Sequence, residues 1–295
     1  MFAKLQSEVR RPAVAGAFYP RGAKELKSTV EAVLSQTTER KLGGLCGVVA
    51  PHAGYPYSGP IAGEAFSILA RSNDAPNRVL LIGPPHYIPV QGIVGPSSSA
   101  FTTPLGDVAV DVGAVESLRD AGLVTIDDTP HAPEHALEVE LPFLQRVLED
   151  FTIVPLLVGA ASPEQVARVI ETVLGKRTLL VVSTDLSHYL DYATAERRDL
   201  ATARTIERLD STTLGPNDAC GFSALNGALC AASRCAWTVT RLDLRNSGDT
   251  SGEKRRVVGY GAWAFTAVER QEKLRPPGFA RDSEDLPRRD HARRA

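Results

Sequence analysis

The chain has 295 residues, 43% of them hydrophobic, which is enough for one large α/β domain or two smaller ones. Its formal net charge of -2 gives no overall positive field, which argues against nucleic acid or an anionic membrane as the main partner. The four cysteines lack the paired spacing of a zinc site and the density of a disulfide-rich secreted protein, which favours a cytoplasmic protein. The sequence has no apolar run of about 18 residues, so we expect no membrane partner.

Short β-branched runs alternate with longer amphipathic stretches, which is typical of a sheet covered by helices on both faces. In chain order we expect a helix at 23–36, a strand at 46–50, a helix at 59–71, a strand at 78–83, helices at 112–121 and 135–149, a strand at 152–158, a helix at 163–175, a strand at 177–183, helices at 191–209 and 218–232, and strands at 236–243 and 257–266. No linker or repeat divides residues 8–268. We therefore expect a single α/β domain with a central, mostly parallel or mixed sheet flanked by helices.

The last part of the chain differs in character from the rest. From Glu269 onward it is rich in charged residues and proline and has few apolar residues. Such a segment cannot bury enough surface to offset the entropy lost on ordering. We expect residues 269–295 to form a disordered tail, and His291 within it to play no part in a site.

Three of the predicted strands run directly into a histidine. The histidines are His52, His86 and His188, which follow the strands at 46–50, 78–83 and 177–183. In open α/β sheets ligands bind beyond the carboxyl ends of the strands, so these imidazoles can converge although the sequence separates them. A single such histidine is more often structural, but the repeated placement predicts a metal-centred site.

Two further residues near these histidines are candidates for proton transfer. Asp185 precedes His188 by three residues, which suits a carboxylate that orients the imidazole, although it equally suits a helix cap. His135 leads into an apolar helix face and is preferred to His131, which lies in a proline-rich approach. We expect His188, His135 and Asp185 to act around the metal.

The motif Pro-His-Ala-Gly-Tyr at 51–55 is compact and suits a pocket. Alanine and glycine after the histidine allow close approach of the backbone, and Tyr55 and Tyr57 can form walls for a small-molecule or peptide ligand. The alternative is a tight turn whose histidine only bonds a carbonyl group.

Cys220 supplies a third candidate ligand, next to Gly221 at the predicted start of the helix at 218–232. The helix dipole and free backbone amides at such a position would favour the thiolate. Together with His52 and His86 it gives three protein ligands, which leaves open coordination positions, unlike a closed structural zinc site. Iron, copper and zinc all accept imidazole and thiolate ligands.

Taken together, these motifs resemble those of the Memo family, also called system protein B of the AmmeMemoRadiSam set, from about Arg11 to Phe265. The matching motifs lie at 15–20, 51–55, 83–86, 102–106, 134–135, 140–142, 183–188 and 220–221. The resemblance implies a fold similar to that of class III extradiol (LigB-type) dioxygenases. In those enzymes two histidines and a glutamate hold non-haem iron, and another histidine is the acid/base.

Mapped onto this sequence, the resemblance implies that His52 and His86 are the histidine ligands and that His188 is the acid/base. Cys220 would stand where the glutamate stands. A thiolate donates more charge than a carboxylate and can be oxidised, which weakens any expectation of ring cleavage. The resemblance also implies partners in the same set, including a radical SAM protein.

Three hypotheses of function follow. The first is a metal-dependent oxidoreductase of dioxygenase-like type, with iron expected first and copper or zinc as alternatives. The second is a non-catalytic module that binds a metal, a peptide or a metabolite. The third is a zinc hydrolase with His188 or Glu138 as its base.

Overall fold

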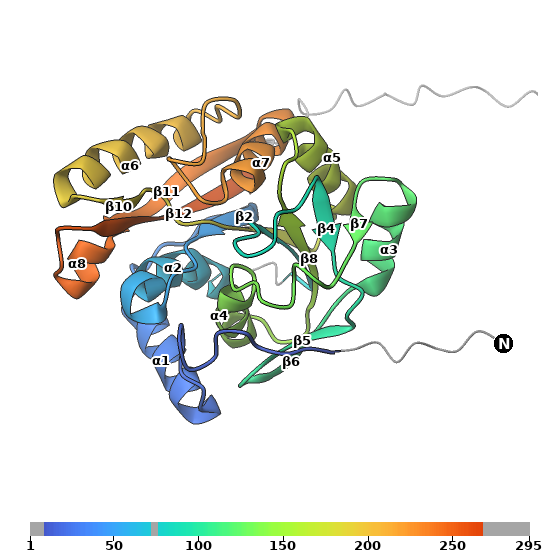
Figure 1. Ribbon diagram of the computed structural model, residues 1–295, viewed down its shortest axis with the longest axis horizontal. Helices are drawn as coiled ribbons and strands as arrows, with labels where there is room; N and C mark the ends of the chain where they lie inside the picture. Colours follow the sequence, from blue (N-terminus) through green and yellow to red (C-terminus); the bar gives the residue numbers. More distant parts are fainter. Residues whose placement is uncertain (1–8, 72–75, 268–295) are drawn as a thin grey trace, which may run out of the picture.

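Four parallel strands form the middle of the main sheet in the computed structural model, which describes residues 9–71 and 76–267 (Figure 1). In spatial order they are β2 (Leu45–Ala50), β9 (Thr178–Ser183), β3 (Arg78–Gly83) and β8 (Thr152–Val158). Their side chains are almost all buried, as continuous apolar runs predict for strands covered on both faces. The predicted tail at 269–295 lies outside the described residues.

Other strands extend this sheet on both sides. β12 (Val257–Ala267) pairs antiparallel with β2, and both β10 (His188–Leu190) and β11 (Trp237–Asn246) pair antiparallel with β12. Beyond β8 lie β4 (Ile93–Gly95) and β7 (Thr125–Ile126), while β1 (Val9–Arg10), β5 (Ala100–Thr103) and β6 (Gly106–Ala109) form a separate small sheet. The expected single α/β domain with a mixed sheet flanked by helices is confirmed.

Helices cover both faces of the sheet. Figure 1 shows α1 (Ala23–Ser35), α2 (Tyr55–Ala70) and α4 (Leu141–Val147) on one side, and α5 (Pro163–Val173), α6 (Tyr192–Glu207) and α7 (Phe222–Arg234) on the other. α3 (Val112–Asp120) contacts α5 and β8, and the short α8 (Ser247–Ser251) follows β11. No helix within the described ranges is both long and apolar enough to cross a bilayer.

Several boundaries differ from the sequence expectation. α2 begins at Tyr55, four residues early, because Pro56 is tolerated in the first turn of a helix. The expected helix at 135–149 is a 3-10 helix, η1 (Glu138–Glu140), followed directly by α4. α7 begins only at Phe222. The short strands β4 to β7 were not predicted, because two to four residues carry no readable periodicity.

One buried carboxylate ties the N-terminal arm to η1. Glu138 accepts hydrogen bonds from Arg10 Nη1 at 2.7 Å, from the backbone N–H groups of Ala13 and Val14 at 2.7 and 3.0 Å, and from the Tyr19 hydroxyl at 2.5 Å. Its side chain is fully buried. Because four donors surround the carboxylate, the cost of burying its charge is offset. The arm thereby fixes the segment that leads into α4.

We expect Glu138→Ala to destabilise the fold by about 3–5 kcal/mol, because it leaves the Arg10 guanidinium as an unpaired buried charge. Denaturant unfolding followed by circular dichroism measures the change. Glu31→Ala is the control, since it removes the partner of Arg146 from an exposed ion pair and should cost less than about 1 kcal/mol. Equal losses in the two variants would contradict an anchoring role for Glu138.

Candidate metal centre

The carboxyl ends of β2, β9 and β3 bring distant loops together. β9 lies between the other two strands, with Ser183 at its end level with Ala50 at the end of β2. Because all three strands are parallel, the residues that follow them leave the sheet at the same edge. His52 after β2 and His86 after β3 therefore meet above the end of β9.

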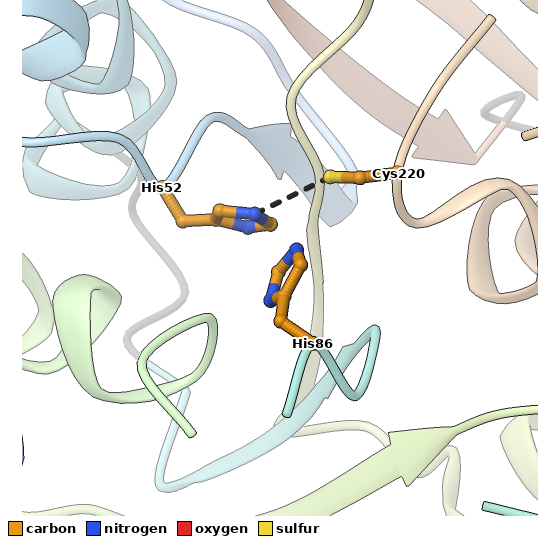
Figure 2. A group of neighbouring side chains, drawn as sticks. All are labelled: His52, His86 and Cys220. Atoms are coloured by element: carbon orange, nitrogen blue, oxygen red, sulfur yellow. Dashed lines mark hydrogen bonds between the residues drawn. The ribbon is translucent and has the colours of Figure 1, made fainter. Parts of the chain in front are cut away.

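His52, His86 and Cys220 form a compact cluster, with the two rings and the sulfur directed toward one another (Figure 2). His52 Nε2 lies 3.3 Å from Cys220 Sγ, and the two imidazole centroids are 5.1 Å apart. One ligand atom from each residue lies within 4.8 Å of the others. Metal bonds of about 2.0–2.3 Å to nitrogen and sulfur place ligand atoms roughly 3–4 Å apart, so the cluster fits a single ion with little movement.

Gly221 explains how Cys220 reaches the cluster. The loop before α7 packs its backbone against the end of β9, where Gly221 N–H donates to Thr184 Oγ1 at 2.9 Å and Cys220 N–H donates to the Asp185 carbonyl at 3.2 Å. A Cβ at position 221 would lie 2.8 Å from Thr184 Cβ and 2.9 Å from the Ser183 carbonyl oxygen. A side chain there would push the loop, and the sulfur with it, away from the histidines.

The thiol of Cys220 is not activated by a helix start, contrary to the sequence expectation. The residue as a whole is only partly buried, but His52, Thr184 and Asp185 enclose its sulfur. Burial, reinforced by the Asp185 carboxyl, raises the pKa of Cys220 to about 12. The metal-free protein therefore carries a thiol, whose proton a bound cation would displace.

Each histidine of the cluster is held at Nδ1 by an oxygen atom of the protein. His52 Nδ1 lies 2.7 Å from Ser183 Oγ, and His86 Nδ1 lies 2.8 Å from Glu134 Oε1. Such contacts, which orient the ring and leave Nε2 for the ion, are typical of metal-binding histidines. Burial, and then His86, hold the pKa of His52 well below its usual range, so this ring is neutral as a metal ligand must be.

Glu134 lies in one of the matching motifs but was assigned no role from the sequence, although it organises this part of the site. Its carboxylate accepts the backbone N–H and Nδ1–H of His86 and the backbone N–H groups of His135 and Ala136. Three of these four donors bond Oε1 and one bonds Oε2. His86, Glu134 and His135 also have metal-ligand spacing, but His86 Nδ1 and Glu134 Oε1 already bond each other at 2.8 Å. The sequence gives one sign of this role, which is that Glu134 directly precedes the candidate histidine His135.

His135 and His188 line the same cavity as His52 and His86. The His135 ring is 4.6 Å from that of His86 and 5.5 Å from that of His52, measured between centroids. Its Nδ1 lies 3.2 Å from Glu134 Oε1 without hydrogen-bond geometry. Burial lowers the pKa of His135 to about 4 and also lowers the pKa of His188, so both rings are neutral at neutral pH.

Asp185 does not orient His188, which corrects the sequence expectation. Asp185 Oδ1 accepts the backbone N–H of His52 at 2.9 Å, whereas His188 Nδ1 bonds the Leu186 carbonyl at 2.8 Å. The alternative role as a helix cap is also wrong, because Asp191 caps α6. Burial raises the pKa of Asp185 to about 7, so a titratable carboxyl group lies beneath the His52 loop.

A cavity of about 480 Å³ opens over the cluster. Besides the histidines, its lining includes the aromatic side chains of Phe18, Tyr57, Tyr87, Tyr189 and Tyr260. A separate cavity of about 420 Å³ lies near Leu45 and Thr178, at the amino ends of β2 and β9, and its described lining contains no histidine or carboxylate. The chemistry therefore favours the first cavity as the ligand site.

Tyr55 is not a wall of this cavity, which corrects a second expectation. It is 3% exposed, its hydroxyl donates to the Val139 carbonyl at 2.8 Å, and its ring lies 4.9 Å from that of Phe143 in the core. The early start of α2 turns Tyr55 inward, while Tyr57 lies at the cavity.

Comparison with known proteins adds independent information. A family model described as Memo-like protein matches residues 10–264, a range that includes every residue of the cluster. The chain is 33% identical to a MEMO1 family protein of Methanopyrus kandleri, over 87% of this chain and 98% of the relative. It is 34% and 35% identical to MEMO1 family proteins of Methanothermobacter thermautotrophicus and Thermotoga neapolitana, in each case over 85% of this chain and 98% of the relative.

His131 lies outside the cluster, and its titration tests how burial changes the pKa of a histidine and the stability of the fold. Its Nε2 lies 3.2 Å from the Val94 carbonyl, and burial lowers its pKa from 6.5 to about 4. Between these two values the unfolded chain takes up a proton and the folded chain does not, so stability should fall as the pH falls, by up to about 3 kcal/mol.

His131→Gln keeps a donor for the Val94 carbonyl but removes the titration. We expect this variant to lose less stability than the wild type over the same pH window, measured as the free energy of unfolding at each pH. Parallel curves for the two proteins would contradict the assigned shift.

Proposed function

The chain belongs to the Memo-like protein family, and from that membership and the geometry of the cluster we propose that it binds a transition-metal ion through His52, His86 and Cys220. The observation that carries the proposal is the meeting of two oriented imidazoles and one enclosed sulfur at ligand spacing (Figure 2). Iron is the metal expected first, from the resemblance to iron-dependent dioxygenases. Copper and zinc are alternatives, because both also accept this donor set.

We further propose that the bound ion supports oxidoreductase chemistry of dioxygenase-like type. Three protein ligands are fewer than these ions take, so positions would remain for a small molecule in the cavity. When bound, iron or copper would supply Lewis acidity and electron transfer, whereas zinc would supply Lewis acidity alone. The chain would orient the small molecule against Tyr57 and Tyr87, and the neutral rings of His188 and His135 would accept a proton from it. Asp185, with a pKa of about 7, would serve as a further proton acceptor or donor.

A second candidate function is a module that binds a metal, a peptide or a metabolite without turnover. The aromatic rim of the cavity favours it: Tyr57, Tyr87 and Tyr189 are 46%, 54% and 64% exposed. Oxygen uptake separates the two functions. With catechol-like compounds, an iron-loaded oxidoreductase should consume oxygen above the rate of the metal-free chain, and a binding module should not.

Zinc hydrolysis ranks third among the candidate functions. Glu138 cannot be its base, because the N-terminal arm occupies that carboxylate with four donors, which leaves only His188. Interaction with a radical SAM protein of the AmmeMemoRadiSam set remains a proposal that follows from the family resemblance.

Cys220→Ala should lower metal content at least about tenfold, because loss of the thiolate leaves only two imidazole ligands. The full chain, purified without a metal-affinity column, is loaded anaerobically with ferrous iron, and bound iron is measured by mass spectrometry against protein concentration. Cys230→Ala is the matched control, since Cys230 is a buried cysteine within α7 and outside the cluster. Equal iron content in the two variants would contradict the assignment of Cys220 as a ligand.

A further inference from the structure

The hydroxyl group of Ser183 lies directly behind His52 and has three polar neighbours. Its Oγ is 2.7 Å from the Ala136 carbonyl oxygen, 2.7 Å from His52 Nδ1 and 2.8 Å from Glu140 Oε1. Ser183 ends β9, the strand between the two that carry the histidines, and both Ser183 and Glu140 are 0% exposed. The surrounding protein atoms must therefore satisfy this hydroxyl.

Counting donors and acceptors gives one complete arrangement of protons. A hydroxyl group has one hydrogen to donate and two lone pairs that accept. The Ala136 carbonyl can only accept, so it takes the hydrogen of Ser183. The other two neighbours must then both donate to Oγ: His52 through Nδ1–H and Glu140 through a carboxylic O–H. Any other arrangement leaves two acceptors facing each other at 2.7 or 2.8 Å with no proton between them.

The surroundings of Glu140 agree with a neutral carboxylic acid. Its Oε2 has no hydrogen-bond partner among the described residues, which costs far less for a neutral acid than for an ionised carboxylate. Burial holds the pKa of Glu140 well above its usual range although the contact with Ser183 lowers it, and the Asp185 carboxyl raises it further. Glu138, two residues earlier and equally buried, instead accepts hydrogen bonds from four donors, one of them the guanidinium of Arg10.

We propose that Ser183 and a protonated Glu140 form a positioning pair that holds His52 as its Nδ1–H tautomer and presents the unprotonated Nε2 to the metal site. The pair acts only through His52, so its members are positioning residues. The proposal rests on the proposed function, because a metal binds only an unprotonated ring nitrogen. In the metal-free protein the same Nε2 can accept from the Cys220 thiol, 3.3 Å away.

The two histidine ligands are thus held by groups of different charge. Burial raises the pKa of Glu134, but contacts with His86 outweigh burial and hold this pKa below its usual value. His86 therefore faces an ionised carboxylate. His52 instead faces a hydroxyl group backed by a neutral acid. Such an arrangement fixes the ring without adding a negative charge that would favour the doubly protonated imidazolium, which cannot bind a metal.

The tautomer is measured directly by long-range ¹H–¹⁵N correlation NMR on the full, metal-free chain labelled at histidine, with the His52 signals assigned by their loss in His52→Asn. We expect wild-type His52 to carry its proton on Nδ1. In Ser183→Ala the Nδ1–H loses its acceptor while an Nε2–H would gain Cys220 Sγ, so the tautomer ratio should shift toward Nε2–H by about tenfold.

Ser67→Ala is the matched control. It removes another buried serine hydroxyl, which donates to the Glu64 carbonyl at 3.1 Å within α2, and should leave the His52 tautomer unchanged. The inference is overturned if wild-type His52 carries its proton on Nε2, or if Ser183→Ala leaves the tautomer as it is in the wild type.

The protonation of Glu140 is measured by infrared spectroscopy at neutral pH. The wild type should show a carboxylic C=O stretching band that Glu140→Gln lacks, whereas a band from Asp185, with a pKa of about 7, is common to both proteins. Glutamine is neutral and offers an N–H to Ser183, so this variant should also retain the Nδ1–H tautomer of His52. Absence of the band from the wild type would overturn the role given to Glu140.

Both measurements use metal-free protein and so differ from the measurement of iron content. A chain that binds iron but carries the His52 proton on Nε2 would keep the proposed function and lose this inference. A chain with the expected tautomer and no affinity for iron or copper would keep the hydrogen-bond assignment and lose the proposed function.

Discussion

The parallel alignment of β2, β9 and β3 is the constraint on which the candidate site depends. Adjacent strands lie about 4.8 Å apart, so residues that leave their carboxyl ends are neighbours whatever their separation in sequence. His52, His86 and Ser183 come from three such ends. Because these strands are buried on both faces, a slip in register would disrupt the packing of their apolar side chains against the helices on either side. The free energy that stabilises the core therefore also fixes the geometry of the ligands.

The sequence was informative where the signal is local. A continuous apolar run predicts a central strand, and the histidine that follows it needs no long-range information. The first residue of a helix is harder to predict from the sequence, and α2 starts four residues earlier than expected. This early start buries Tyr55 against the core and leaves Tyr57 at the cavity. Asp185 lies near His188 in sequence, but the turn of the chain after β9 directs its carboxyl to the backbone of His52 instead.

Burial and tertiary hydrogen bonds are the parts that the sequence did not disclose. Nothing local distinguishes Glu138, which meets four donors from the N-terminal arm, from Glu140, which meets one hydroxyl group. The charge state of Cys220 was misjudged for the same reason, since the helix dipole can be anticipated from a helix start and the enclosure of the sulfur cannot. Glu134 gains its importance only from the approach of His86, a residue far away in the chain.

The bond between Arg10 and Glu138 spans 128 positions of the chain. Glu138 lies between Glu134 and Glu140, the residues that support His86 and, through Ser183, His52. Closing so long a loop costs conformational entropy that is recovered only once many other contacts exist. The ligand cluster should consequently be assembled at a late stage of folding, so that partly folded chains offer a metal ion separate side chains in place of a finished pocket.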